Sequence, residues 1–293
     1  MVLVPNNDVQ RPQARGNTLE DRTDTIDRLA LLRVAAPEIW IRKGLPMFTV
    51  MDWQARQERW EYSRRGLERL IPDVFTMDYF LKLPRLGGGR EAEARELVFD
   101  QGTVFRSFSG IVWPRVVIKR FYWHSRTDQL KQARAMHSFH ILSDFWFRCG
   151  RLPSVEGNPA EPLIRIPEII TLKYPFSVMR SLNYPDTVRA DLLDRELKQK
   201  VYNNIVRFGN LLVYHQKEKV IRRFERAGLE YPNPDFNPKN VFAKLDHKNS
   251  SGIRNIWVID QASSEGGPTY EGLRRKGSSG IMFDTAAWGL NSN

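Results

Sequence analysis

Three consecutive glycines, Gly87 to Gly89, divide the chain into two parts that differ in hydrophobic period. Before them, segments 18–32 and 49–71 carry apolar residues at helical spacing. After them, segments 96–108 and 111–123 are rich in Val, Ile and aromatic residues, which is typical of strands. The change of period predicts an α+β protein with a boundary near residue 86.

The remaining elements can be predicted from the same patterns. Segment 127–147 has helical spacing, and segments 166–172 and 174–179 have the composition of short strands. A long helix is predicted by apolar residues that recur every three or four positions: Leu193, Leu197, Val201, Ile205, Phe208 and Leu212. The run IWVID, residues 256–260, is then predicted to be a buried strand that ends in an acid. Helices and strands therefore both occur along most of the chain.

Composition and charge exclude several classes of protein. The chain has 293 residues and 41% hydrophobic residues, enough to bury a core, and its single Cys149 excludes a disulfide framework. It shows no signal peptide and no apolar run that could span a membrane, so we expect an intracellular protein, cytoplasmic or nuclear. The net charge of +11 raises the question of nucleic acid. However, Lys and Arg outnumber Asp and Glu by only 14 to 12, 14 to 9 and 17 to 13 in residues 1–85, 86–180 and 181–293, which argues against a dedicated basic surface.

Four polar residues occur where their surroundings disfavour them. Lys119 ends the apolar run RVVIK, and Asp260 ends IWVID. Asp235 and Asn240 bracket the loop DFNPKN. A charge at the end of a buried strand is costly unless it is paired or binds a ligand. Phosphoryl transfer has a use for all four, because it needs a cation on the phosphates, oxygen ligands for magnesium and a carboxylate for the attacking hydroxyl.

In the order and approximate spacing of these motifs, residues 97–290 resemble the protein-kinase-like superfamily, which includes protein kinases and the aminoglycoside and choline phosphotransferases. The resemblance implies that Lys119 pairs with phosphates, that Asp235 is the catalytic base, and that Asn240 and Asp260 hold Mg²⁺. It also implies that Gly102 and Val104 belong to the glycine-rich loop and that the backbone near Met179 to Ser181 meets the adenine of ATP. The run FDTAAWGL is similar to a helix of the larger lobe that begins with a buried Asp, here Asp284.

The fold that the resemblance implies has two lobes. We expect an N-terminal, partly disordered helical extension at 1–85, which could also bind a protein partner. An N-lobe with a small antiparallel sheet and one helix would follow at 86–180, and a short, mainly helical C-lobe at 181–293, with the hinge near 179–185. The chain ends nine residues after Asp284, where family members continue through further helices, so the resemblance is to a divergent or truncated member.

Three functions stay open at this point. The first is an ATP- and Mg²⁺-dependent kinase acting on a protein or small-molecule hydroxyl, favoured by the presence of all four polar residues. The second is a pseudokinase that acts as a binding or scaffold module. It is favoured by the poor glycine loop and by the lack of any Glu between Lys119 and Glu156 to pair with the lysine, for which Asp128, Asp144 or Gln132 could substitute. The third is a basic nucleic-acid-binding protein, whose affinity would collapse with salt.

Overall fold

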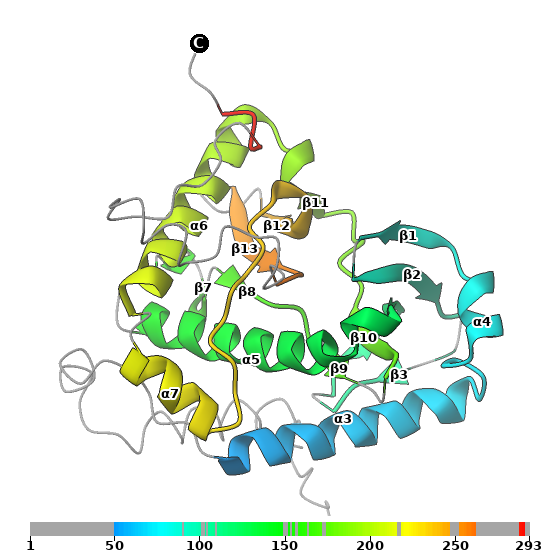
Figure 1. Cartoon of the computed structure of the whole chain (residues 1–293). Coiled ribbons are helices and arrows are strands. Elements are labelled where there is room, and N and C mark those ends of the chain that lie inside the picture. Colours follow the sequence, from blue (N-terminus) through cyan, green and yellow to red (C-terminus); the bar gives the residue numbers. More distant parts are fainter. Residues whose placement is uncertain are drawn as a thin grey trace, which may run out of the picture.

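The protein is represented by a computed structural model that describes residues 50–89, 91–100, 103, 105–108, 110–148, 152, 154–155, 158–162, 164–171, 174–215, 218–246, 252–261 and 287–290. The helix expected at 18–32 lies outside these residues, as do Gly102, Val104 and Asp284. In the described part the chain is α+β, with antiparallel sheets and helices (Figure 1).

The described part of the chain segment before the glycines, from residue 50 to residue 82, is mainly helical, as the periodicity of 49–71 predicts. Helix α3 spans Val50–Leu70, and the short helix α4 spans Met77–Lys82 with Thr76 as its N-cap. Trp60 and Leu67 of α3 are buried, whereas Leu70 is exposed. Because α3 contacts strands β3 and β9, this helix packs on the body of the protein.

A five-stranded antiparallel sheet follows, in the order β1-β2-β5-β10-β9. Its strands are β1 (Arg85–Gly88), β2 (Ala92–Val98), β5 (Arg115–Phe121), β9 (Ile169–Thr171) and β10 (Phe176–Arg180). A small hairpin of β3 (Phe105–Arg106) and β4 (Val112–Trp113) is inserted between β2 and β5. The strand expected at 96–108 is thus different in the structure: β2 starts earlier, at Ala92, and ends at Val98. Residues 92–96 include Ala and Glu, which have low strand propensity, so their extended conformation is attributed to pairing with β5.

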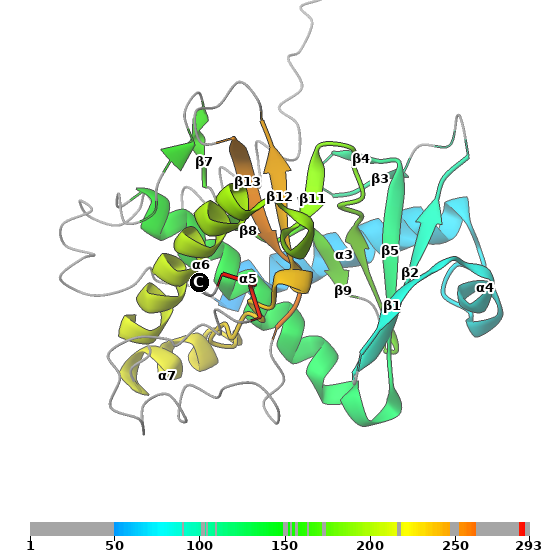
Figure 2. The same cartoon turned by 90° about the horizontal axis from the view of Figure 1, so that it is seen from above.

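Helix α5 (Arg126–Arg148) follows β5 through the 3₁₀ turn η1 (Trp123–Ser125) and joins the two sheets of the protein. Its Gln129 side chain donates a hydrogen bond to the Phe176 carbonyl of β10, and its Ser143 hydroxyl donates one to the Ile164 carbonyl of β8. In Figures 1 and 2, α5 runs past both sheets. This helix can therefore present side chains to the region where the sheets meet.

The second sheet has four strands in the order β11-β12-β13-β8. They are β8 (Ile164–Arg165), β11 (Thr187–Arg189), β12 (Val241–Leu245) and β13 (Ile253–Val258), and β8 pairs with β13 in parallel. A separate hairpin is formed by β6 (Ser154–Val155) and β7 (Asn158–Pro162). Strand β8 precedes residue 180, so the second sheet takes a strand from the chain segment that also supplies the first.

The helices of the second half are α6 (Arg195–His215) and α7 (Glu218–Arg226), with the 3₁₀ turns η2 (Ala190–Leu192) and η3 (Pro238–Asn240). Helix α6 buries the face that its periodicity predicts: Val201, Ile205, Phe208 and Leu212 are fully buried. Phe208 contacts the rings of Phe139 and Trp146 on α5. The hydrophobic core therefore continues from α6 to α5.

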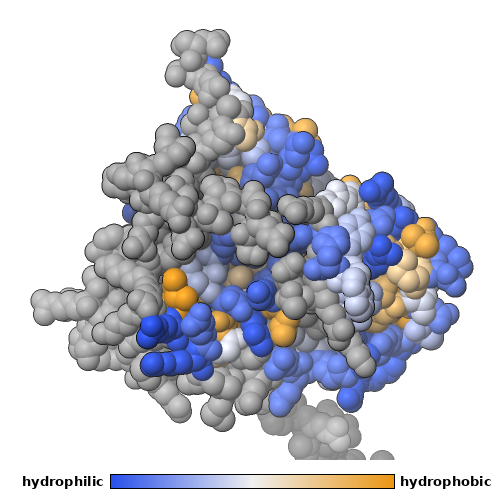
Figure 3. Space-filling model, viewed as in Figure 1, coloured by the Kyte–Doolittle hydropathy of each residue, from blue (hydrophilic) through white to orange (hydrophobic). Residues whose placement is uncertain are grey.

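The described surface is mainly hydrophilic on the face seen in Figure 1, as Figure 3 shows. Exposed hydrophobic residues in this part of the chain include Leu81 and Leu86. In the residues that the structure describes, no helix is both long and apolar enough to cross a membrane.

Candidate functional site

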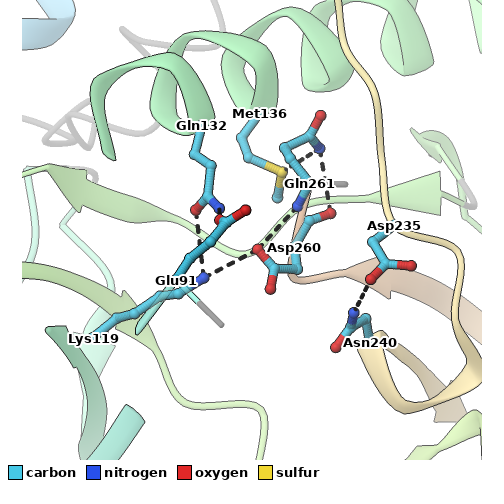
Figure 4. Close-up of polar contacts among 8 residues, drawn as sticks. All are labelled: Glu91, Lys119, Gln132, Met136, Asp235, Asn240, Asp260 and Gln261. Carbon is cyan, nitrogen blue, oxygen red and sulfur yellow. Dashed lines mark hydrogen bonds and ion pairs between the residues drawn. The ribbon is translucent and has the colours of Figure 1, made fainter. Parts of the chain in front are cut away.

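Lys119 lies on the central strand of the first sheet and points toward the second. It is opposite Ala94 of β2 and Ser177 of β10 in the strand register. Its Nζ atom forms an ion pair with Oδ1 of Asp260 at 3.0 Å (Figure 4). The two residues are 141 positions apart in the sequence, so the fold brings together the lysine and the strand-end acid.

Asp260 follows β13, and its backbone runs beside the loop that contains Asp235. The Asp235 N–H donates to the Asp260 carbonyl at 3.0 Å, and the Ile259 N–H donates to the Asn240 carbonyl at 3.0 Å. A bridge between Pro234 and Gln261 extends this contact. Backbone hydrogen bonds therefore fix the acid after β13 relative to the loop before β12.

The loop DFNPKN is folded around the carboxylate of Asp235. The Asn237 N–H donates to Asp235 Oδ1 at 3.0 Å, which forms an Asx turn, and the Asn240 amide donates to Oδ2 at 2.7 Å. Asn237 caps the turn η3, in which Pro238 is the first residue. Asp235 and Asn240 are thus in direct contact, as Figure 4 shows.

Burial raises the pKa of Asp235 above the ordinary value of an aspartate, and the nearby charge of Asp260 raises it further. The hydrogen bonds from Asn237 and Asn240 and the charge of Lys119 act in the opposite direction, but the net pKa shift is upward. A carboxylate with a raised pKa is a stronger proton acceptor when ionised. This is the property that a general base needs near neutral pH.

Gln261 is a site residue whose role the sequence did not reveal. Its buried side chain accepts a hydrogen bond from the Asn233 N–H at 2.8 Å and donates one to Met136 Sδ on α5 at 2.8 Å. It thus joins the acid-bearing segment, the loop before Asp235 and helix α5. The available signal was an amide directly after the acid that ends the run IWVID.

The segment after β10 is held by a second missed residue, Glu96 on β2. Glu96 is 8% exposed, and its carboxylate accepts hydrogen bonds from the Ser181 hydroxyl at 2.6 Å and the Asn183 amide at 3.4 Å. Met179 and Ser181, the expected adenine contacts, are both buried. The Ser181 N–H donates to the Arg115 carbonyl at 3.4 Å, so a base near it would have to use other groups of this segment.

The three consecutive glycines, Gly87 to Gly89, lie where β1 ends and the turn to β2 begins. We call this turn, residues 87–91, the glycine-rich turn; it is separate from the expected glycine-rich loop of Gly102 and Val104. Gly88 is opposite Glu93, and the Gly89 N–H donates to the Ala92 carbonyl at 2.9 Å. Space around these residues differs, because a Cβ atom on Gly87 or Gly89 would meet nothing within 4 Å, whereas one on Gly88 would lie 2.9 Å from the Arg85 guanidinium. The turn is at the end of the sheet nearest Lys119, since Ala92 to Ala94 pair with Phe121 to Lys119.

Two side chains of the site carry oxygen atoms of the kinds that can bind a magnesium ion. Asp260 and Asn240 supply carboxylate and amide oxygens, and Mg²⁺ commonly takes one or two protein ligands and completes its shell with water and phosphate oxygens. In the described residues, no group of three or more His, Cys, Asp or Glu could hold a metal ion. A metal site formed by the protein alone is therefore not supported in this part of the chain.

Residues 287–290 pack, through Trp288, against the loop that contains Asp235. The Trp288 indole N–H donates to the Phe236 carbonyl at 3.2 Å, and its ring contacts Tyr202 of α6. Trp288 is almost completely buried. The run FDTAAWGL therefore supports the loop through its Trp, while Asp284 lies outside the described residues.

Comparison with known proteins gives no match, either in a scan against models of protein families or in a search of the curated proteins. Function is therefore inferred from the site. Its central groups are one cation, Lys119, and two carboxylates, Asp235 and Asp260, with the amide of Asn240 beside them.

Proposed function

We propose that this protein is an ATP- and Mg²⁺-dependent phosphotransferase, a kinase that acts on a hydroxyl group of a protein or small molecule. The observation that carries the proposal is the convergence of Lys119 on β5, Asp235 and Asn240 in the loop before β12, and Asp260 after β13. A lysine, two acids and an amide within one site are the groups that phosphoryl transfer uses. All four residues are partly buried, and gathering charged groups away from water is costly unless they are paired or bind a ligand.

We also propose that the fold is the two-lobed fold of the protein-kinase-like superfamily. The five-stranded antiparallel sheet with helix α5 would form the smaller lobe, and α6, α7 and the second sheet the larger one. In support, the segment 181–186 connects β10 to β11 and so joins the two sheets. This is where the hinge of such a fold would lie.

In the proposed reaction, Asp235 accepts the proton of the substrate hydroxyl. The hydroxyl oxygen forms a bond to the γ-phosphorus of ATP while the bond from phosphorus to the bridging oxygen of ADP breaks. Two hydrogen bonds hold the Asp235 carboxylate in position, and its raised pKa suits proton transfer. The products are ADP and a phosphate ester.

Lys119 would bind the phosphates of ATP next to Asp260. Its ammonium group is already oriented by Asp260, and 15% of its side chain is exposed, so little reordering is needed when a ligand arrives. Asp260 and Asn240 would hold Mg²⁺, which when bound neutralises charge on the β- and γ-phosphates.

A second candidate function is a pseudokinase, which binds a nucleotide or a partner without efficient transfer. Lys119 meets the neutral amide of Gln132 on α5, at 3.4 Å, where active kinases have a glutamate. A neutral partner orients the lysine less strongly than a carboxylate does.

Thermal unfolding with ATP, with and without Mg²⁺, tests the proposal on the wild-type protein, Asp260→Asn and Lys119→Met. A ligand at 100 times its Kd stabilises the folded state by about 2.7 kcal/mol, which is a measurable increase in Tm. We expect a shift that requires Mg²⁺ and is lost in Asp260→Asn. A wild-type protein with no shift at millimolar MgATP would refute the nucleotide site.

Transfer itself separates the two candidates. Phosphorylation of a peptide and metabolite library by the wild-type protein, with Asp235→Asn as control, would establish a kinase. MgATP binding without any Asp235-dependent ADP release would instead favour the pseudokinase. Binding to DNA or RNA that falls steeply with salt and is unchanged in Asp260→Asn would favour the nucleic-acid alternative.

A further inference from the structure

Lys119 has an indirect connection to a third carboxylate, that of Glu91. The Gln132 side chain of α5 lies between the two: its Oε1 accepts from Lys119 Nζ at 3.4 Å, and its Nε2 donates to Glu91 Oε2 at 2.8 Å. Figure 4 shows the three side chains in this order. The amide of Gln132 therefore has its oxygen toward the cation and its nitrogen toward the anion.

This arrangement fixes the orientation of the amide. Reversing it would bring an NH₂ group against the ammonium and an oxygen against the carboxylate, and both contacts are repulsive. An amide dipole aligned between opposite charges strengthens both hydrogen bonds, because each has one ionised partner. Gln132 can thus transmit the effect of the Glu91 charge to Lys119.

Glu91 is part of the glycine-rich turn and not of a helix. It follows Gly87 to Gly89 in the sequence, and its backbone carbonyl accepts a hydrogen bond from the Tyr122 N–H at 2.9 Å. That bond ties the turn to the end of β5, three residues after Lys119. The carboxylate is therefore anchored by its own backbone to the strand that carries the lysine.

We propose that Glu91 is a positioning residue for Lys119, acting through Gln132, and that it takes the part of the glutamate that α5 lacks. The inference rests on the proposed nucleotide site for its functional consequence. It implies that the orientation of the lysine depends on this turn as well as on Asp260, because Glu91 is attached to the turn.

Moving the carboxylate to the helix tests the proposal. We would compare the wild-type protein with Glu91→Gln, Gln132→Glu and the double variant Glu91→Gln/Gln132→Glu. In the double variant the helix bears the acid and pairs directly with Lys119, while the new glutamine donates to it. The matched control is Glu93→Gln, two residues further on in strand β2, since Glu93 pairs with Arg95 at 2.8 Å and with Arg85 at 3.5 Å.

We expect Glu91→Gln to weaken MgATP binding about tenfold, as loss of an outer partner commonly does. The control should leave the Kd unchanged, and the double variant should restore it to within about threefold of wild type, because a direct ion pair replaces the relay. A structural role alone would be visible as lower stability without recovery in the double variant. A wild-type Kd for Glu91→Gln, measured where Lys119→Met abolishes binding, would overturn the inference and leave the proposed function standing.

A second measurement uses no nucleotide, so it decides the relay even if the proposed function fails. Free energies of unfolding in urea are measured for Glu91→Gln, for Lys119→Met and for the variant that combines these two substitutions. The relay predicts that the two effects are not additive, whereas Glu93→Gln and Lys119→Met should add. Additive effects of Glu91→Gln and Lys119→Met would show that the carboxylate does not act on the lysine.

Discussion

The buried carboxylate of Glu96 should be essential for the stability of the connection between the two sheets. Glu96→Ala removes the acceptor for the Ser181 hydroxyl, at 2.6 Å, and for the Asn183 amide, at 3.4 Å. The Ser181 hydroxyl, in a residue that is 1% exposed, would then have to find another partner in a small cavity.

The size of the effect follows from these contacts. A hydrogen bond to a charged group contributes about 1.5–3 kcal/mol to stability. The hydrogen bond from Asn183 is long, at 3.4 Å, so we expect it to contribute about 1.5 kcal/mol or less. Arg115 is 4.0 Å from the carboxylate, and 34% of its side chain is exposed, so it adds at most about 0.5 kcal/mol. We therefore expect Glu96→Ala to lower the free energy of unfolding by about 3 kcal/mol. Glu96→Gln, which keeps the shape and one acceptor, should cost about 1 kcal/mol.

Urea unfolding followed by circular dichroism measures both variants. The control is Glu196→Ala, the same substitution at an ion pair with Lys200 on the surface of α6, where 79% of the Glu196 side chain is exposed. An exposed pair of this kind contributes less than about 1 kcal/mol. If Glu96→Ala costs no more than Glu196→Ala, the hydrogen bonds of Glu96 do not stabilise the fold, and the reasoning is wrong.

Three further predictions concern the loop and its supports. The pKa of Asp235 is higher in the folded state than in the unfolded state, so ionisation of this carboxylate destabilises the fold as pH rises from the unfolded pKa through the folded pKa. Asp235→Asn should therefore raise Tm at pH 7. The difference in Tm between this variant and the wild-type protein should shrink as pH falls below the ordinary aspartate pKa. An unchanged Tm difference between pH 3 and pH 7 would contradict it. Gln261→Leu should lower the free energy of unfolding by about 1 kcal/mol in urea, because the partly buried Asn233 N–H loses its acceptor. Gln199→Leu, the same substitution at an exposed position of α6, is the control. Trp288→Phe should lower the rate of the proposed phosphate transfer more than a distant variant of equal stability does, because the Phe236 carbonyl, next to the proposed base Asp235, loses its donor. An equal loss of rate in the distant variant would refute a specific role.

The helices and the central strands were predicted from local patterns. The apolar face of α6 and the helix at 127–147 are confirmed, because hydrophobic periodicity directly reflects burial. The first sheet was predicted less well. Strands β1 and β2 contain mostly Gly, Ala, Arg and Glu, whose strand propensity is low, and only pairing with β5 makes them strands.

The site could be predicted in part. Lys119 and Asp260 were singled out because a charged residue ends an apolar run, and the ion pair between them shows that they are neighbours in the fold. Asp235 and Asn240 share a short motif and are in contact. Glu91 and Glu96 carried no such signal, since a sequence in which acids alternate with Ala and Arg, as in residues 91–96, is typical of a solvated surface. Their partners are 41 and 85 residues away in the sequence, so only the fold reveals them.

The parallel pairing of β8 with β13 has a consequence for how the molecule comes apart. The chain leaves the first sheet through α5, adds β8 to the second sheet and returns to the first as β9 and β10, so the two sheets are interlaced and not simply strung along the chain. A protease cut between residues 182 and 186 would sever one connection only. The two fragments would stay associated through β8, whose Ile164 is fully buried opposite Ile256, and the nicked protein would elute in gel filtration at the size of the intact one.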